Sequence, residues 1–169
     1  MGFPIRFSRG LKLLLPLLLL AYGLGSGEQS LGNWLESAGC VALLFGSVAV
    51  HEFGHVLAVQ RLGLTVNGVT LTAFGGLTDY EGCERSALAQ GLIAVAGPCA
   101  SALLALVLLA VRLSVGGIDV DGGLAGVLTF GVGTNALIAV VNLLPFPTLD
   151  GGQIVRSFWT GLSRRRERA

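Results

Sequence analysis

The sequence predicts an all-α polytopic membrane protein of about four transmembrane helices, with a small cytoplasmic-side β-hairpin and a short interfacial C-terminal helix. Of 169 residues, 53% are hydrophobic and only 12% are charged, whereas about a quarter of an average soluble domain is charged. The apolar residues also gather in runs long enough to cross a bilayer, which takes roughly 20 residues. Without internal repeats or linkers, residues 1–169 form one predicted domain. The three long runs are about 38–60, 88–111 and 123–144.

A shorter apolar run, residues 13–25, precedes these three and contains Pro16. We expect it to be the first of the four transmembrane helices. The alternative is a cleavable signal peptide, because basic residues followed by a leucine stretch also describe such a leader. No clear A-x-A cleavage site follows the run, which favours a retained helix.

The distribution of basic residues predicts the orientation in the membrane. If the N-terminus is cytoplasmic and all four runs span, ten of the eleven lysine and arginine residues fall on the cytoplasmic side. Only Arg112 falls on the other side. Cytoplasmic loops carry such an excess of basic residues. We therefore expect a multi-pass protein of a bacterial-type cell membrane with both termini in the cytoplasm and no nucleic-acid partner.

Residues 62–82, between the second and third spans, alternate apolar and polar side chains around Asn67-Gly68. This dipeptide within an alternating pattern is a strong hairpin signal. We expect a β-hairpin or small sheet at the cytoplasmic membrane surface, and an ordinary surface loop is the alternative. The predicted apolar face holds Val66, Val69, Leu71 and Ala73, and the polar face holds Thr65, Thr70 and Thr72.

Small residues recur at Gly97 and Ser101 in the third span. This spacing lets helices approach closely, so we predict a packing role for both residues.

The last span ends in NLLPFPTLDGG, residues 142–152. Pro145 and Pro147 cannot both continue a helix, so the backbone must unwind over residues 144–148. Irregular backbone at membrane depth is tolerated only where it is buried or lines a wet cavity, and broken helices often mark binding sites. Asp150 follows this break directly. The remaining residues, 153–169, are predicted to form an interfacial helix and a basic tail.

The only two histidines of the chain belong to HEFGH, residues 51–55. On a helix, His51 and His55 lie one turn apart on one face, where both can bind one zinc ion. Glu52 is turned about 100° from His51, so it is better placed to act as a general base on a water molecule. Ionisable residues inside a membrane span usually mark a functional site. Two buried histidines bonded to backbone carbonyls are the alternative.

A catalytic zinc ion needs a third protein ligand. His55 lies six residues before Arg61, and Asp150 lies six residues before Arg156, on spans that run in the same direction. Both side chains are therefore expected about 9 Å from the cytoplasmic ends of their spans. Asp150 is the acidic residue outside the motif that matches this depth, although it could also cap the following helix.

Asn135 and Asn142 lie seven residues apart on one face of the fourth span. Either could bind the substrate backbone or a developing oxyanion, or could hold neighbouring helices together. Both readings stay open for Asn142, and packing is favoured for Asn135.

These motifs resemble the site-2 protease family of intramembrane zinc metalloproteases. The resemblance rests on HEFGH at 51–55, FGG at 74–76, AGP at 96–98 and NLLPFPTLDGG at 142–152. It implies one zinc ion held by the two histidines and the aspartate, and it implies the catalytic glutamate. It also implies that the hairpin and the Phe74-Gly75-Gly76 loop guide substrate to the site. With no PDZ or CBS domain in the sequence, we expect a minimal member.

The predicted function is regulated intramembrane proteolysis: cleavage of transmembrane segments of single-span or membrane-tethered proteins. An edge strand near residues 69–78 could capture an unwound substrate by β-augmentation. Two rivals remain at this point, a zinc-binding membrane protein that transports or senses metal, and an inactive binder of transmembrane helices. The sequence names neither a substrate nor an oligomeric state.

Overall fold

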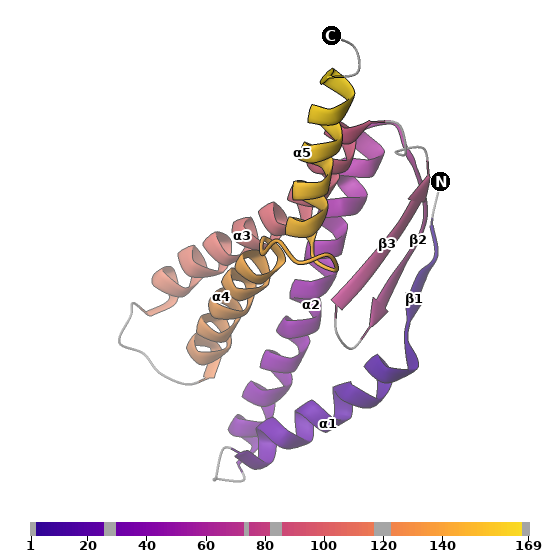
Figure 1. The fold of residues 1–169 in the computed structure, drawn as a ribbon. Coiled ribbons are helices and arrows are strands. Elements are labelled where there is room, and N and C mark those ends of the chain that lie inside the picture. The colour runs from indigo at the N-terminus through magenta and orange to yellow at the C-terminus, as the bar shows by residue number, and fades with distance from the viewer. Residues whose placement is uncertain (1–2, 26–29, 73–74, 82–85, 117–122, 167–169) are drawn as a thin grey trace.

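The computed structural model describes residues 3–25, 30–72, 75–81, 86–116 and 123–166. Over these residues the chain forms five helices and a small sheet that lies at one side of them (Figure 1). The helices are α1 (Arg9–Gly25), α2 (Leu31–Arg61), α3 (Ala87–Gly116), α4 (Gly123–Asn142) and α5 (Asp150–Arg166). The strands are β1 (Ile5–Phe7), β2 (Thr65–Thr72) and β3 (Gly75–Glu81).

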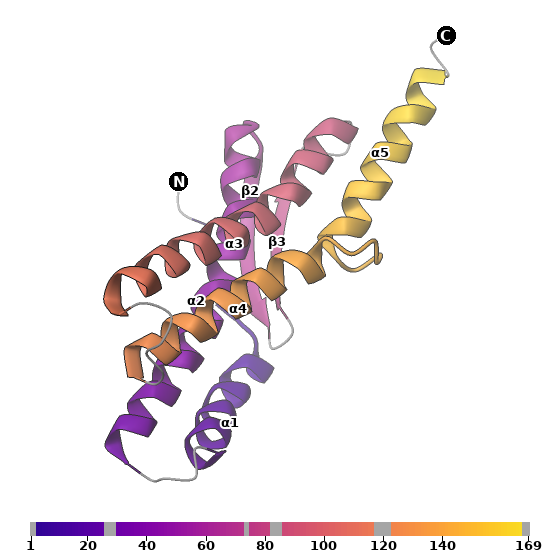
Figure 2. The same cartoon turned by 90° about the vertical axis from the view of Figure 1, so that its left-hand side faces the viewer.

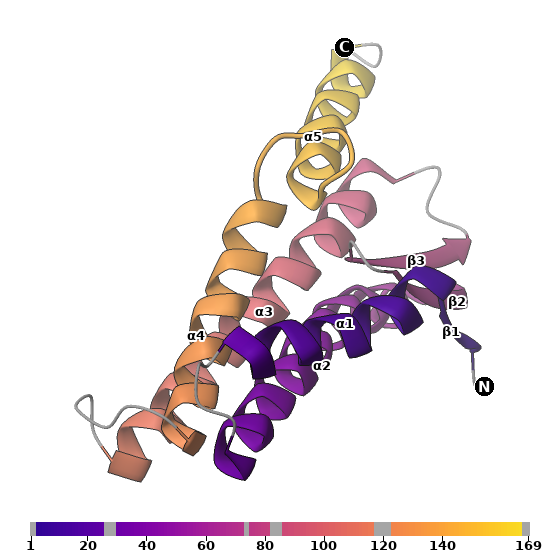
Figure 3. The same ribbon diagram turned by 90° about the horizontal axis from the view of Figure 1, so that it is seen from below.

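Helix α2 is the axis of the fold. The sheet lies on one of its sides and α3 and α4 lie on the other, while α1 runs beside its N-terminal half (Figures 1 and 3). Ser30 caps its start, where the side chain accepts a hydrogen bond from the backbone N–H of Asn33 at 3.2 Å. It ends before Gly63, whose φ of +72° is the left-handed conformation that terminates many helices.

Three of the described helices, α2, α3 and α4, are long and apolar enough to cross a membrane. They coincide with the three long runs, so those predicted spans are confirmed as helices. The prediction of a fourth span is not confirmed, because α1 has 17 residues and falls short of the other three. The helix itself forms, and Pro16 lies within it.

The sheet has the order β1-β2-β3. Strands β2 and β3 form the predicted antiparallel hairpin, but the prediction of a turn at Asn67-Gly68 is wrong. This dipeptide lies inside β2 at a register shift between Val66 and Gly68. The two strands are instead joined through residues 73 and 74, which lie outside the described residues. The sheet has a third strand, within the two to three strands expected, but this strand is β1 from the N-terminal segment, which pairs in parallel with β2 and had no signal in the sequence pattern.

The register shift explains why the residues of the predicted apolar face still lie on one face, although the turn is not at Asn67-Gly68. An extra residue in one strand lets side chains on both sides of it face the same way. Val66, Val69 and Leu71 accordingly pack together against Val56 of α2 and Leu11 of α1. Ala73, the fourth predicted member of this face, lies outside the described residues. The sheet is thereby fixed on α2 beside the HEFGH turn.

The predicted break after the last span is confirmed. Helix α4 ends at Asn142, and α5 begins at Asp150. Helix α5 packs on α3 and extends past the end of α4 (Figure 2). A methyl group at Gly91 of α3 would lie 2.8 Å from the Ser157 hydroxyl of α5, so the two helices meet closely there. The predicted placement of this C-terminal helix in the membrane interface stays a prediction.

Candidate metal centre and its cavity

The two histidines of HEFGH lie one turn apart on α2 and are buried, with 5% of His51 and 7% of His55 exposed. Their ring centroids are 5.0 Å apart, and the two Nε2 atoms are separated by 3.2 Å. The helical spacing of the motif therefore brings the same nitrogen of each ring to one point, as the sequence predicts.

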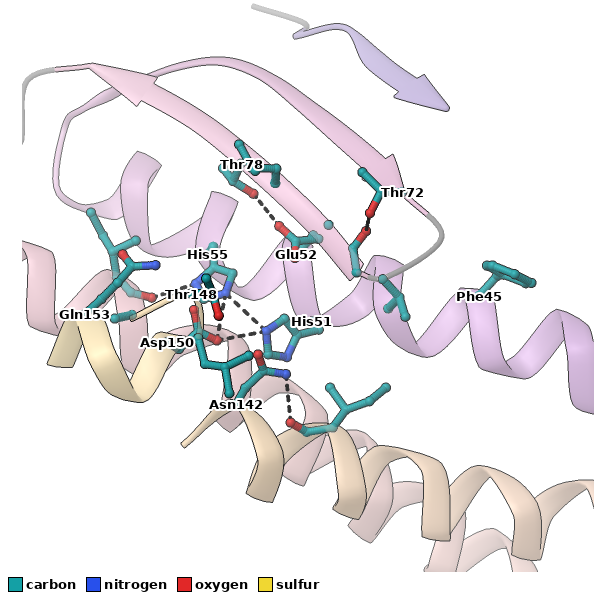
Figure 4. Close-up of a pocket in the computed structure, with 18 of the residues that line it drawn as sticks. Phe45, His51, Glu52, His55, Thr72, Thr78, Asn142, Thr148, Asp150 and Gln153 are labelled. Atoms are coloured by element: carbon teal, nitrogen blue, oxygen red, sulfur yellow. Dashed lines mark hydrogen bonds and ion pairs between the residues drawn. The ribbon is translucent and has the colours of Figure 1, made fainter. Parts of the chain in front are cut away.

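Asp150 reaches that point from the start of α5. Its Oδ2 atom lies 3.1 Å from Nε2 of His51 and 3.4 Å from Nε2 of His55 (Figure 4). The residue is 8% exposed. The broken segment between α4 and α5 turns the chain so that Asp150 faces α2. The structure thus brings Asp150 to the two histidines, in agreement with the matched depth of His55 and Asp150.

The outer nitrogens of both rings are also engaged. Nδ1 of His55 lies 2.8 Å from the backbone carbonyl oxygen of Ile93, and Nδ1 of His51 lies 2.9 Å from Oγ of Ser101. A carbonyl oxygen can only accept, so Nδ1 of His55 carries the hydrogen, and in the neutral ring Nε2 presents a lone pair to the centre. The Ser101 hydroxyl can accept from His51 in the same way. Such partners fix the orientation and tautomer of metal-binding histidines.

The three inner atoms form a donor set that fits a zinc ion. Two imidazole lone pairs and a carboxylate oxygen that face one another at 3.1–3.4 Å repel unless a cation or a proton lies among them. Tetrahedral ligands at about 2.0–2.1 Å from zinc lie about 3.3 Å from each other. The observed separations match that spacing.

Gly97 of α3 closes one side of this donor set. A Cβ atom built at this position would overlap Nε2 of His55 and lie 2.7 Å from Nε2 of His51. Glycine is therefore required for α3 to pass so close to the two rings. The close helix contact predicted at Gly97 is therefore a contact between the backbone of α3 and the two histidine rings of α2.

Glu52 lies beside the donor set and faces the sheet. Its Oε2 atom accepts a hydrogen bond from Oγ1 of Thr78 at 2.8 Å (Figure 4). A carboxylate oxygen of Glu52 also lies within 4.8 Å of a nitrogen of each histidine, so by distance alone it could compete as third ligand. Asp150 is favoured, because one of its oxygens is within 3.4 Å of both Nε2 atoms.

The two histidines, Asp150, Glu52 and Thr78 line one cavity of about 620 Å³. Its walls come from α1, α2, the β2–β3 hairpin, α3, α4 and the start of α5. The lining combines apolar and polar side chains, which suits a peptide that brings both apolar side chains and a backbone. The apolar lining residues include Leu14, Leu44, Phe45, Val48 and Ile138, and the polar ones include Thr72, Thr78, Asn142, Thr148 and Gln153.

The predicted substrate-binding residues separate into three groups. Asn142, Gly75 and Gly76 line the cavity. Asn135 does not: it is fully buried, and its Nδ2 donates to Oγ of Ser47 at 2.7 Å, which joins α4 to α2. Packing is thus the role that its contacts support. Phe74 lies outside the described residues.

Sequence reasoning missed Thr78 and gave Ser101 only a packing role. The small-residue spacing in the third span indicated a close helix contact, but it gave no indication that the Ser101 hydroxyl meets a histidine. The sequence around Thr78 indicated only a strand and gave no sign of a contact with Glu52.

Comparisons with known proteins agree with this geometry. The model of peptidase family M50 matches residues 39–126 and 117–169. The chain is 33% identical over 136 residues to the Mycobacterium tuberculosis protein named "Putative zinc metalloprotease Rip3", covering 80% of this chain and 35% of that one. It is 28% identical over 158 residues to zinc metalloprotease MJ0392 of Methanocaldococcus jannaschii, covering 93% of this chain and 43% of that one.

A solved structure is also similar. The site-2 protease from Methanocaldococcus jannaschii superposes with a TM-score of 0.69 at 26% identity. The match covers 95% of this chain and 69% of that chain. This chain therefore spans less than half the length of the curated relatives above, and more than two thirds of the solved structure.

Proposed function

Since this chain belongs to peptidase family M50 and contains three helices apolar enough to span a membrane, we propose that it is an intramembrane zinc protease. Its substrates would be transmembrane segments of single-span or membrane-tethered proteins. The observation that carries the proposal is the meeting of His51, His55 and Asp150 at one point beside Glu52, within a cavity.

In this proposal His51, His55 and Asp150 hold the metal. A zinc ion bound there supplies a Lewis acid that polarises the scissile carbonyl and makes water a stronger acid at neutral pH. Ser101 and the carbonyl of Ile93 keep the two imidazoles in the required tautomer and orientation. The carboxylate of Asp150 contributes negative charge at the N-terminus of α5, where the helix dipole stabilises it.

Glu52 does the proton transfer. Its carboxylate takes a proton from the attacking water as the new C–O bond forms. The same proton then passes to the departing amine nitrogen as the C–N bond breaks, which returns Glu52 to its starting state. The 6% exposure of Glu52 keeps bulk water from competing with this exchange.

Strand β3 is the proposed site of substrate capture. It is an edge of the described sheet, and its inner side lines the cavity. A transmembrane helix hides its peptide bonds, so the substrate must unwind before cleavage. Pairing of the unwound segment with β3 would replace its lost backbone hydrogen bonds. A Cβ atom built at Gly75 would meet no other atom within 4 Å, so this residue leaves room for the substrate, and Asn142 lines the same cavity.

The charge distribution supports a cytoplasmic location for both termini and for the end of α2 that lies nearest the centre. Cleavage would then release the cytoplasmic part of a tethered protein.

The proposed function is tested by cleavage in proteoliposomes. The probe is a single Leu/Ala-rich transmembrane helix with a central Gly-Gly pair, labelled with a fluorophore and a quencher at its two ends. We expect the full chain to cleave it, the chelator 1,10-phenanthroline to stop cleavage, and added zinc to restore it. Zinc binding without any cleavage would instead favour a metal-sensing or metal-transporting protein.

Replacing Ser101 with alanine is expected to weaken zinc binding by about 10-fold to 100-fold, because the partner that orients His51 is lost. The measurement is competition with a chromophoric chelator, which needs no substrate. Ser47→Ala is the matched control, since Ser47 is equally buried but contacts Asn135. Equal zinc affinity in Ser101→Ala and the wild type would contradict this role.

A further inference from the structure

We propose that Thr78 is a positioning residue that joins the substrate-binding strand to the catalytic carboxylate. This inference rests on the proposed function, because it assigns Glu52 the proton transfer and β3 the capture of substrate. In this proposal Thr78 binds neither the metal nor the scissile bond. It acts through Glu52.

The contact itself is specific. Thr78 Oγ1 donates to Oε2 of Glu52 at 2.8 Å, from a strand to a helix 26 residues earlier in the chain (Figure 4). A hydrogen bond to a charged group is stronger than one between neutral groups. The bond uses one of the lone pairs of Oε2 and leaves the others of the carboxylate to take a proton from water. It thus holds the carboxylate in one orientation.

The neighbouring residues of β3 show that the strand is built around this contact. Along β3 the inward positions are Gly76, Thr78 and Tyr80, whereas Leu77 and Asp79 are exposed. A Cβ atom at Gly76 would overlap the Glu52 side chain. Two successive inward positions therefore serve one carboxylate: Gly76 lets the backbone approach it, and Thr78 binds it.

The start of β3 is held as well. Thr72 at the end of β2 donates from its hydroxyl to the backbone carbonyl of Gly75 at 2.8 Å. This bond ties the cavity end of β3 to β2, which rests on α2 through Val69 and Leu71. The position of the Thr78 hydroxyl over Glu52 is therefore set by the whole hairpin.

The consequence is a link between substrate loading and catalysis. The outer edge of β3 would receive the substrate, while its inner face holds the base. Backbone pairing along the outer edge restrains the strand, and through Thr78 it restrains the carboxylate in the position that takes the proton. Loss of the hydroxyl should leave substrate capture intact and slow the chemical step.

The test uses two substitutions of Thr78 with the proteoliposome assay above. Thr78→Val keeps the shape of the side chain but removes the donor, and Thr78→Ser keeps the donor but removes the methyl group. We expect Thr78→Val to lower kcat by about tenfold with KM unchanged. Thr78→Ser should retain near wild-type kcat, and zinc content should stay at the wild-type level in both variants. Thr70→Val, the same substitution on β2, is the matched control and should retain wild-type kcat.

A purely structural role for Thr78 predicts a different pattern. Thr78→Val with wild-type kcat, or with a higher KM alone, would overturn the inference. Equal loss of kcat in Thr78→Ser and Thr78→Val would overturn it too, because the hydroxyl would then not be the group that matters. A wild-type chain with no chelator-sensitive cleavage would contradict the proposed function, which makes the two failures distinguishable.

Discussion

Glu52→Gln is expected to abolish measurable cleavage while the protein keeps its zinc. Glutamine has nearly the shape of glutamate, but its amide cannot take a proton from water. Loss of a general base typically lowers the rate by about 100-fold to 10,000-fold. The bond from Thr78 can survive, because the amide oxygen of glutamine still accepts. Cleavage of the labelled helix and zinc content by mass spectrometry are measured on the same preparation.

Glu36→Gln provides the control for this prediction. Glu36 lies on the same helix, but its Oε2 accepts from the backbone N–H of Gly123 at the start of α4. Its neutralisation should leave cleavage near the wild-type rate. Full activity in Glu52→Gln would remove Glu52 from the chemistry, and loss of zinc in that variant would indicate that Glu52 is a ligand.

Asp150→Asn is expected to remove both zinc and activity. The neutral amide replaces a carboxylate oxygen that lies within 3.4 Å of both histidine Nε2 atoms, and zinc sites in proteins strongly prefer anionic oxygen to amide ligands. Purified Asp150→Asn should contain well under one zinc ion per chain. Its affinity in competition with a chelator should fall by more than that of Ser101→Ala, because a direct ligand is lost.

Asp79→Asn is the matched control, because Asp79 lies on the outward face of β3 and is exposed. Together with Glu52→Gln, this experiment decides between the two candidate carboxylates. If Asp150→Asn kept its zinc and Glu52→Gln lost it, the third ligand would be Glu52.

The candidate centre could be foreseen because its determinants are local or set by topology. The spacing of His51 and His55 fixes a shared helix face, and the two prolines near Asp150 fix a break at a known depth. In a membrane protein, residues on different spans can be compared by their predicted depth below the membrane surface. Outside the HEFGH motif, Asp150 is the acidic residue whose predicted depth matches that of His55, so depth alone selected it as the third ligand.

The remaining features depend on contacts that a local pattern does not encode. Asn67-Gly68 is a good turn by itself, but packing of Val66 and Val69 on α2 outweighs that preference and absorbs the dipeptide as an irregularity within β2. Strand β1 is only three residues long and forms because β2 offers it an edge. Thr78 and Ser101 acquire their partners only when separate elements meet.

The separation of the ligands along the chain has a consequence for biosynthesis. His51 and Asp150 are 99 residues apart, and the aspartate follows the last of the three apolar helices. The ribosome must therefore synthesise all three of these helices before the third ligand exists. Under the proposed function, a nascent chain that still lacks Asp150 would have an incomplete metal site and could not cleave its neighbours in the insertion machinery.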